Sequence, residues 1–128
     1  MPASRRSVDP RELRESIAEL LPWLDGAAEA PSRSRLAVAV RTSLRTLEQL
    51  APGRSVEVRV PPFAAVQCVG GPQHTRGTPP NVVETDPRTW LLLVTERLSW
   101  AEALEEGRVE ASGSRADLSS WLPLLRFS

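Results

Sequence analysis

The fold is decided by residues 81–125, NVVETDPRTWLLLVTERLSWAEALEEGRVEASGSRADLSSWLPLL. Asp86 can accept a hydrogen bond from a free amide at a helix start, and Pro87 suits the first helical position because it has no amide hydrogen to lose. Three apolar residues then recur at helical spacing, namely Trp90, Leu93 and Val94. The sequence therefore predicts a short strand over 81–85 and a helix that begins at Pro87.

A second helix and a strand follow in the same stretch. Ser99 and Glu102 have the spacing of a capping box, and Gly107 can take the left-handed conformation that ends helices. Val109 and Ala111 alternate with polar residues, which predicts a strand over 108–112 with one covered face.

A final helix is expected after Asp117, which can cap it. Its apolar residues fall at helical spacing: Leu118, Trp121, Leu122 and Leu125. Pro123 is compatible with this helix only if its ring and its missing amide hydrogen are accommodated.

Two helices are expected before the first strand. Residues 1–8 are polar and are expected to be disordered, so a single domain covers residues 9–128. The first helix begins at a cap and proline at 9–10 and ends near Pro22 and Gly26. The second begins near Pro31 or Ser32 and ends at Pro52 and Gly53.

Two strands then complete the expected sheet. Alternating valines predict a strand over 55–60, and an apolar run predicts another over 63–69. Pro61 and Pro62 cannot supply the positive φ of a tight hairpin turn. We therefore expect a wider bend or a bulge between the two strands. With the strands over 81–85 and 108–112, these residues predict an α+β domain.

Composition excludes several classes of protein. The 128 residues suffice for one core, and 16 basic side chains, all Arg, balance 16 acids, so nothing predicts a nucleic-acid partner. The single Cys68 cannot form an internal disulfide, which fits a reducing compartment. The apolar runs are far shorter than the ~20 residues of a membrane helix, and the chain start lacks a secretory signal. We expect a cytoplasmic protein.

The loop 70–81, GGPQHTRGTPPN, holds the only histidine, His74. Long loops of this composition are often binding loops. His74 and Arg76 could orient an anionic head group, with Arg76 as a bidentate donor. Alternatively, Arg76 pairs with an acid such as Glu84 and His74 caps a turn.

No motif predicts catalysis or a cofactor. A zinc site needs three or four protein ligands, whereas the chain offers only His74, Cys68 and acids. Neither a G-x-S-x-G elbow nor a phosphate-binding loop occurs. Cys68 lies in a strand pattern without a basic neighbour, which favours a small buried side chain over a reactive thiol. We expect no metal, no cofactor and no enzymatic activity; an enzyme using His74 would need a polar cleft around its loop.

Four tryptophans carry most of the aromatic content, since the chain has two Phe and no Tyr. Trp90, Trp100 and Trp121 lie on the three predicted helices of the C-terminal stretch, and Trp23 lies near the end of the first helix. They are either core residues or the lining of an apolar cavity between helices and sheet.

Several motifs carry a resemblance to a known family. Residues 81–125 combine a strand, a helix with W-L-x-L from Trp90, and A-L-x-x-G-R-V-x-A-x-G over 103–113. In this they resemble the second half of the sterol carrier protein type 2 fold. Nearly the whole chain, including VEVRVPPFAAVQC at 56–68 and HTRGTPPN at 74–81, is similar to small actinobacterial proteins of the sterol carrier family.

The resemblance implies a mixed, mostly antiparallel sheet of four to five strands with helices packed on one face. It also implies an apolar tunnel for fatty acyl chains, acyl-CoA or sterols. Where the family commonly has Gly before a basic linker residue, this chain has Glu96 before Arg97, so we expect a different linker backbone and tunnel mouth. The chain ends without an S-K-L peroxisomal address.

The leading hypothesis is noncatalytic binding of an apolar or lipid ligand. Its predicted apolar lining is Trp90, Val94, Leu98, Trp100, Trp121 and Leu125, with His74 or Arg76 at the tunnel mouth. The alternative is an interaction module with a filled core that forms a homodimer or docks on an enzyme. An open apolar cavity would favour the first hypothesis, and side chains packed between sheet and helices would favour the second.

Overall fold

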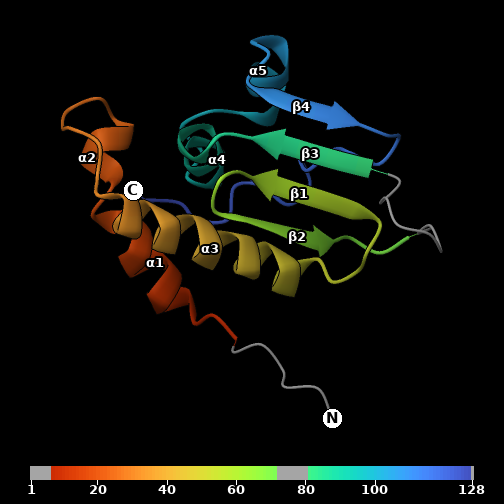
Figure 1. The fold of residues 1–128 in the computed structure, drawn as a ribbon, viewed down its shortest axis with the longest axis horizontal. Helices are drawn as coiled ribbons and strands as arrows, with labels where there is room; N and C mark the ends of the chain where they lie inside the picture. Colours follow the sequence, from red (N-terminus) through yellow and green to blue (C-terminus); the bar gives the residue numbers. More distant parts are fainter. Residues whose placement is uncertain (1–6, 72–80, 128) are drawn as a thin grey trace.

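The computed structural model describes residues 7–71 and 81–127 (Figure 1). Helices and strands follow in the order α1 (Pro10–Ala18), α2 (Leu21–Leu24), α3 (Arg33–Leu50), β1 (Val56–Val60), β2 (Ala64–Cys68), β3 (Asn81–Thr85), α4 (Pro87–Val94), α5 (Trp100–Glu105) and β4 (Val109–Ser112). This is the α+β architecture that the sequence predicts.

The four strands form one mixed sheet in the order β2-β1-β3-β4. β1 is antiparallel to β2 and parallel to β3, and β3 is antiparallel to β4. One row across the sheet joins Val66, Val58, Val83 and Ala111. The predicted mixed, mostly antiparallel sheet is therefore confirmed.

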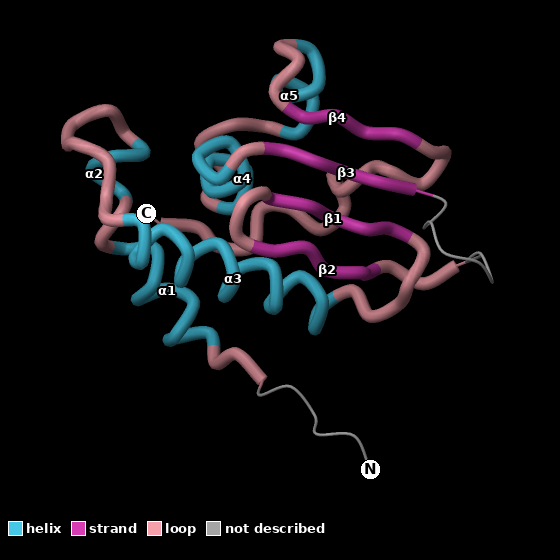
Figure 2. Tube along the Cα trace, viewed as in Figure 1, coloured by secondary structure: helices cyan, strands magenta, loops and turns pink. Residues whose placement is uncertain are grey.

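One face of the sheet is apolar and covered. The side chains of β1 alternate between buried valines and half-buried polar residues, as a strand with one covered face requires. α3 packs along β2 and α4 packs on α3, while α1 covers the outer side of α3 (Figures 1 and 2). All of these elements contribute to one hydrophobic core.

The N-terminal region differs from the predicted single first helix. α1 ends at Ala18 and the short α2 begins at Leu21, with Pro22 in its first turn. Proline has no amide hydrogen for the preceding turn, so the chain makes a new helix start there. Val8 already belongs to the core, and its amide donates to Gln49 Oε1 at 2.6 Å.

The hairpin between β1 and β2 has a three-residue connection. Val60 pairs with Ala64, so residues 61–63 connect the strands, and the Pro61–Pro62 peptide is cis. The amide of Phe63 donates to the carbonyl of Val60 at 3.0 Å. This connection is wider than a tight two-residue turn, as the sequence predicts.

The ends of β1 and β2 are set by a close backbone approach. β2 ends at Cys68 because Val69 has a φ of 64°, which leaves the strand conformation. A Cβ atom on Gly53 would lie 2.2 Å from the carbonyl oxygen of Val69. Only glycine fits at this crossing, because a side chain on residue 53 would overlap the backbone of Val69.

The predicted closing helix after Asp117 is wrong, since no helix occurs in the described residues beyond α5. Residues 118–127, called here the C-terminal segment, form turns, and the Leu122–Pro123 peptide is cis. Pro123 would break a helix by losing a hydrogen bond and clashing with the preceding turn. Instead, the amides of Leu124 and Leu125 donate to the carbonyl of Val94 at 3.0 and 3.1 Å.

Trp90 is the largest fully buried side chain of the described residues. Its indole Nε1 donates to Ser43 Oγ at 2.8 Å, and Ser43 Oγ donates to the carbonyl oxygens of its own helix. This bond joins α4 to α3 inside the core and satisfies the one polar atom of the indole.

Leu118 should anchor the C-terminal segment although it lies in no regular element. It is fully buried, so Leu118→Ala should lower the free energy of unfolding by about 2–5 kcal/mol through lost burial and a residual cavity. Leu104→Ala is the matched control: Leu104 is 42% exposed, and its truncation should change stability by about 0.5 kcal/mol or less. Urea denaturation measures both. Equal effects of the two variants would contradict the anchoring role.

Candidate ligand-binding site

An apolar hollow lies where α4, the α4–α5 linker and the C-terminal segment meet. Its volume is about 270 Å³. Its lining is Leu93, Glu96, Leu98, Ser99, Trp100, Ala101, Ser119, Leu122 and Pro123. Leucine, proline and tryptophan dominate this lining and Glu96 is its one charged residue, which is the chemistry of a site for an apolar group.

The start of α5 forms one wall of the hollow. The amide of Glu102 donates to Ser99 Oγ at 3.1 Å, and the amide of Ser99 donates to Glu102 Oε1 at 3.0 Å. This is the capping box that the sequence predicts. The bond from the Ser99 amide lowers the pKa of Glu102 below its ordinary value. The cap fixes the helix start and so positions Trp100.

The linker between α4 and α5 takes the backbone conformation typical of glycine without containing one. Glu96 has a φ of 65°, in the left-handed region. The amides of Arg97 and Leu98 both donate to the carbonyl of Leu92, at 2.9 and 3.2 Å, which closes the end of α4. Glutamate here makes a turn that suits glycine. The expected difference of the linker backbone and tunnel mouth from the family stays a prediction.

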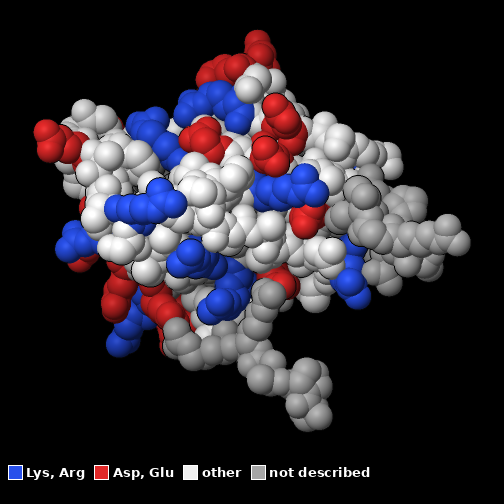
Figure 3. Space-filling model, in the orientation of Figure 1, with Lys and Arg blue, Asp and Glu red and all other residues white. Residues whose placement is uncertain are grey.

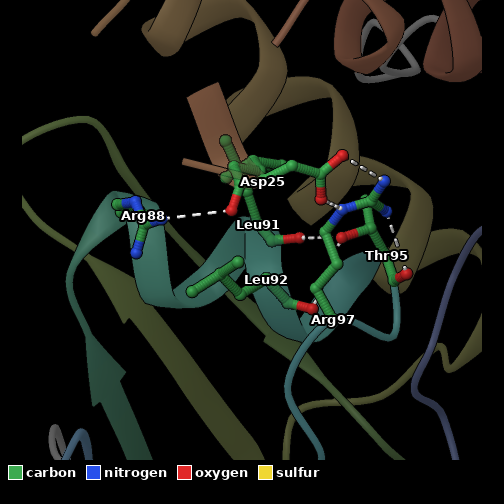
Figure 4. A network of polar contacts seen from close by, with 7 residues as sticks. Asp25, Arg88, Leu91, Leu92, Thr95 and Arg97 are labelled. Atoms are coloured by element: carbon green, nitrogen blue, oxygen red, sulfur yellow. Dashed lines mark hydrogen bonds and ion pairs between the residues drawn. The ribbon is translucent and has the colours of Figure 1, made fainter. Parts of the chain in front are cut away.

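Arg97 ties this linker to the loop after α2 (Figure 4). Its Nε and Nη2 atoms donate to the two carboxylate oxygens of Asp25 at 2.5 and 3.2 Å. The bond from Arg97 holds the pKa of Asp25 below its ordinary value. On the other side, Arg88 donates to the carbonyl of Leu24 at 3.1 Å, and its guanidinium lies 5.5 Å from the Trp23 ring. These contacts fix α4 and its linker against α2.

The structure divides the predicted apolar lining into three groups. Leu98 and Trp100 line the hollow, and their side chains are at most 9% exposed. Trp90 and Val94 are fully buried in the core. Trp121 and Leu125 are half-buried and border a separate hollow made by residues 120–126 of the C-terminal segment.

The predicted lining contains two of the nine residues that line the hollow, Leu98 and Trp100, and lacks the other seven. Among these seven are Leu93, which the sequence predicts on the apolar face of a helix, and Leu122 and Pro123, which fall in the predicted closing helix. The spacing of the apolar residues predicted their burial without indicating this contact. His74 and Arg76, the predicted mouth residues, lie outside the described residues.

Cys68 is fully buried in β2. Burial, with a smaller contribution from the charge of Glu48, raises the pKa of its thiol from 9.0 to about 12. The thiol is therefore protonated at neutral pH and cannot act as a nucleophile there.

Two kinds of feature do not occur in the described ranges 7–71 and 81–127. No group of three or more His, Cys, Asp or Glu side chains there could hold a metal ion. No helix in these ranges has the length and apolar character of a membrane span.

A larger groove lies on the opposite side of the helical layer, between α1 and α3. Its volume is about 590 Å³. It is lined by Asp9, Arg11, Glu12, Glu15, Ser16, Glu19, Ser34, Arg35 and Val38. No local sequence pattern predicts this groove, because it depends on how the two helices pack.

Comparison with known families identifies the chain. The model of a family described as bacterial SCP ortholog matches residues 32–124, from the N-cap of α3 through most of the C-terminal segment. The chain belongs to this family. The match to this sterol carrier protein-like family includes every residue that lines the hollow, whereas α1 lies outside it. A comparison with curated proteins gives no match.

Glu96→Gly should stabilise the protein. A left-handed conformation costs a residue with a side chain about 1–2 kcal/mol, whereas glycine adopts it freely but loses more entropy on folding. The net gain should be roughly 0.5–1 kcal/mol, because the lost ion pair with Arg126 is well exposed. Glu15→Gly in α1 is the control and should cost about 1 kcal/mol. A lower stability of Glu96→Gly than of the wild type in thermal or urea unfolding would contradict the inference that the backbone at Glu96 is strained.

Between pH 9 and 12, the pH dependence of the free energy of unfolding should come from Cys68. The chain has no Lys and no Tyr, so Cys68 is the only side chain expected to titrate between pH 9 and 12. Its folded pKa is raised, so the unfolded state loses the proton first, and the free energy of unfolding should fall by roughly 1.4 kcal/mol per pH unit across that window.

The control for this pH dependence is Cys68→Ala. It should be less stable at pH 8 because the core loses a side chain, but its stability should be flat between pH 9 and 11. A thiol reagent at pH 8 should label the wild-type chain only in denaturant. Rapid labelling of the native protein would contradict the burial of Cys68.

Proposed function

We propose that this protein binds and carries an apolar ligand without catalysing a reaction. The proposed ligand is a fatty acyl chain, an acyl-CoA or a sterol-like molecule. The observation that carries the proposal is the apolar hollow lined by Leu98, Trp100 and Leu122, in a chain that belongs to a sterol carrier protein-like family.

The size of the hollow limits which part of a ligand it can hold. Its 270 Å³ lies just below the ~300–1,000 Å³ typical of small-molecule sites, so it accommodates one end of a lipid and not a whole molecule. Trp100 and the leucines supply apolar contacts, and Glu96 at the rim disfavours an anionic group there. The apolar end of the ligand therefore enters first.

A larger site requires movement of the C-terminal segment. The buried side chain of Leu118 anchors the start of this segment, and two hydrogen bonds to the carbonyl of Val94 and an ion pair between Arg126 and Glu96 hold the rest. Both partners of the ion pair are more than half exposed, so it contributes at most about 1 kcal/mol. Displacement of the segment would join the hollow to the second hollow, which Trp121 and Leu125 border. In this proposal both residues then belong to one larger site.

His74 and Arg76 remain proposed contacts for a polar head group. The described ends of their loop, Gly71 and Asn81, lie at the end of the sheet opposite α4 (Figure 1). A single ligand that contacts both this loop and the hollow must span the length of β3, about 16 Å at 3.3 Å per residue. A long-chain lipid meets this requirement.

A second candidate function is an interaction module with a filled core. The packing of Trp90 favours it, because this side chain is fully buried and hydrogen-bonded between α3 and α4. Native mass spectrometry of the protein from its own host, followed by organic extraction, separates the two functions. A stoichiometric lipid would support the carrier, whereas a clean ligand-free mass would favour the interaction module.

Filling the hollow should weaken ligand binding. Ser119 lines the hollow and is exposed, so Ser119→Phe should occupy it without disturbing the core. We expect the affinity for a fluorescent long-chain fatty acid to fall about tenfold or more, corresponding to about 1.4 kcal/mol.

The neighbouring Ser120→Phe is the matched control, because Ser120 is also exposed but does not line this hollow. It should bind the probe as the wild type does. Equal affinity of Ser119→Phe and the wild type would exclude this hollow as the ligand site.

A further inference from the structure

One of the residues that line the groove between α1 and α3 is apolar and exposed. Val38 of α3 is 52% exposed and lines the groove together with Ser16 and Ser34. Val38 and Leu50 are the large hydrophobic residues that α3 exposes among the described residues. This surface is separate from the hollow of the proposed lipid site, so the following inference does not depend on a ligand.

The two flanks of this surface carry opposite charges. On the α1 side the groove is lined by four acids, Asp9, Glu12, Glu15 and Glu19, against Arg11 and Arg35. On the other side of α3, next to β2, lie arginines: Arg33 over the Phe63 ring at 5.3 Å, and Arg41, whose Nε donates to the Phe63 carbonyl at 3.3 Å. Arg45 borders the same β2 edge. Figure 3 shows acidic side chains gathered over α1 beside basic ones over α3.

The acids of α1 and the arginines of α3 also lie at similar positions along the axis of α3. Val8 contacts Gln49 and Glu19 contacts Arg35, so α1 runs antiparallel to α3. Interpolation between these two contacts places Glu15 level with Arg41. Across the two helices, the surface therefore presents the acid Glu15 on one side, the apolar Val38 between, and the base Arg41 on the other side.

We infer that the protein forms a two-fold symmetric dimer in which α3 of each copy lies in the α1–α3 groove of the other. A second copy is the occupant because the chain itself supplies the complementary charges. A two-fold axis parallel to α3 leaves each charge at its level and exchanges the flanks. Glu15 of each copy then faces Arg41 of the other, and the two Val38 side chains meet near the axis. An axis perpendicular to α3 would instead place acids against acids.

The size of the surface predicts a weak dimer. At 1.5 Å per residue, the 18 residues of α3 extend about 27 Å, and two helices side by side are about 20 Å wide. The buried area is thus at most about 1,000 Å² in total, which is the lower limit for a specific interface. We expect a dissociation constant in the micromolar range and a marked dependence on salt.

Sedimentation equilibrium of the full chain, after removal of lipid by organic extraction and refolding or by a hydrophobic resin, tests this inference. Over about 1–500 μM protein, the mass should rise from one chain to two, and raising salt from about 0.05 to 0.5 M should weaken association several-fold. A single-chain mass over the whole range at low salt would overturn the inference.

Two single variants locate the interface. Val38→Asp should weaken association at least tenfold, because two carboxylates would meet at the axis. Leu104→Asp is the control, since Leu104 is 42% exposed on α5, away from α1 and α3, and should dimerise as the wild type does. Thermal unfolding checks that both variants fold. Unchanged association of Val38→Asp would overturn the inference.

A charge exchange tests the orientation. Glu15→Arg and Arg41→Glu should each weaken association several-fold, since each places like charges across the interface. The double variant in one chain should restore association towards the wild type, because the opposite charges then meet again. Additive weakening in the double variant would contradict the two-fold arrangement.

Discussion

The rest of the structure depends on the burial of Trp90 between α4 and α3. Its indole is completely removed from water, and its single polar atom donates to Ser43 Oγ. Burial of this side chain contributes several kcal/mol, but only because the nitrogen finds an acceptor; a buried indole without one would lose part of that gain. The bond therefore fixes the one orientation in which α4 can pack on α3. Through α4, it also fixes the carbonyl of Val94, to which the C-terminal segment is bonded.

This constraint determines where a ligand can be held. Trp90, Val94 and the valines of β1 are fully buried and fill much of the space between sheet and helices, which is the packing that favours an interaction module. Apolar space remains at the end of α4, where the linker turns at Glu96 and the C-terminal segment crosses as an irregular chain. The C-terminal segment makes few backbone bonds to this layer, so we expect its part beyond the anchored Leu118 to move at a lower cost than the helices.

Local sequence signals predicted the elements but not their contacts. The caps at Asp86 and Ser99 and the alternating valines of β1 each follow from a few neighbouring residues, and the structure contains all three. The closing helix failed because the periodicity of Leu118, Trp121 and Leu125 reports burial and not helical backbone, while Pro123 was the decisive residue. Of the predicted ligand contacts, Leu98 and Trp100 meet at the hollow, but Trp90 lies in the core. No local pattern distinguishes a tryptophan that fills a core from one that lines a cavity, because both are apolar and both recur at helical spacing.

The hollow and the groove lie on different helices of the molecule. The hollow lies against α4 and the groove against α3, so a lipid and a second copy can bind without competing for the same residues. The elements that separate these surfaces are joined by the bond between Trp90 and Ser43 and by the packing of α3 on α4. Closely packed side chains transmit displacement, and they couple two sites when the packing has two alternative arrangements. The fully satisfied indole provides no such alternative between α3 and α4. The C-terminal segment, however, also contacts α1, because the guanidinium of Arg14 lies 4.7 Å from the centroid of the Phe127 ring and donates to the carbonyl of Arg126 at 3.4 Å. A ligand that displaces this segment would therefore act on a helix that lines the groove, so the route by which lipid and self-association could be coupled passes through α1.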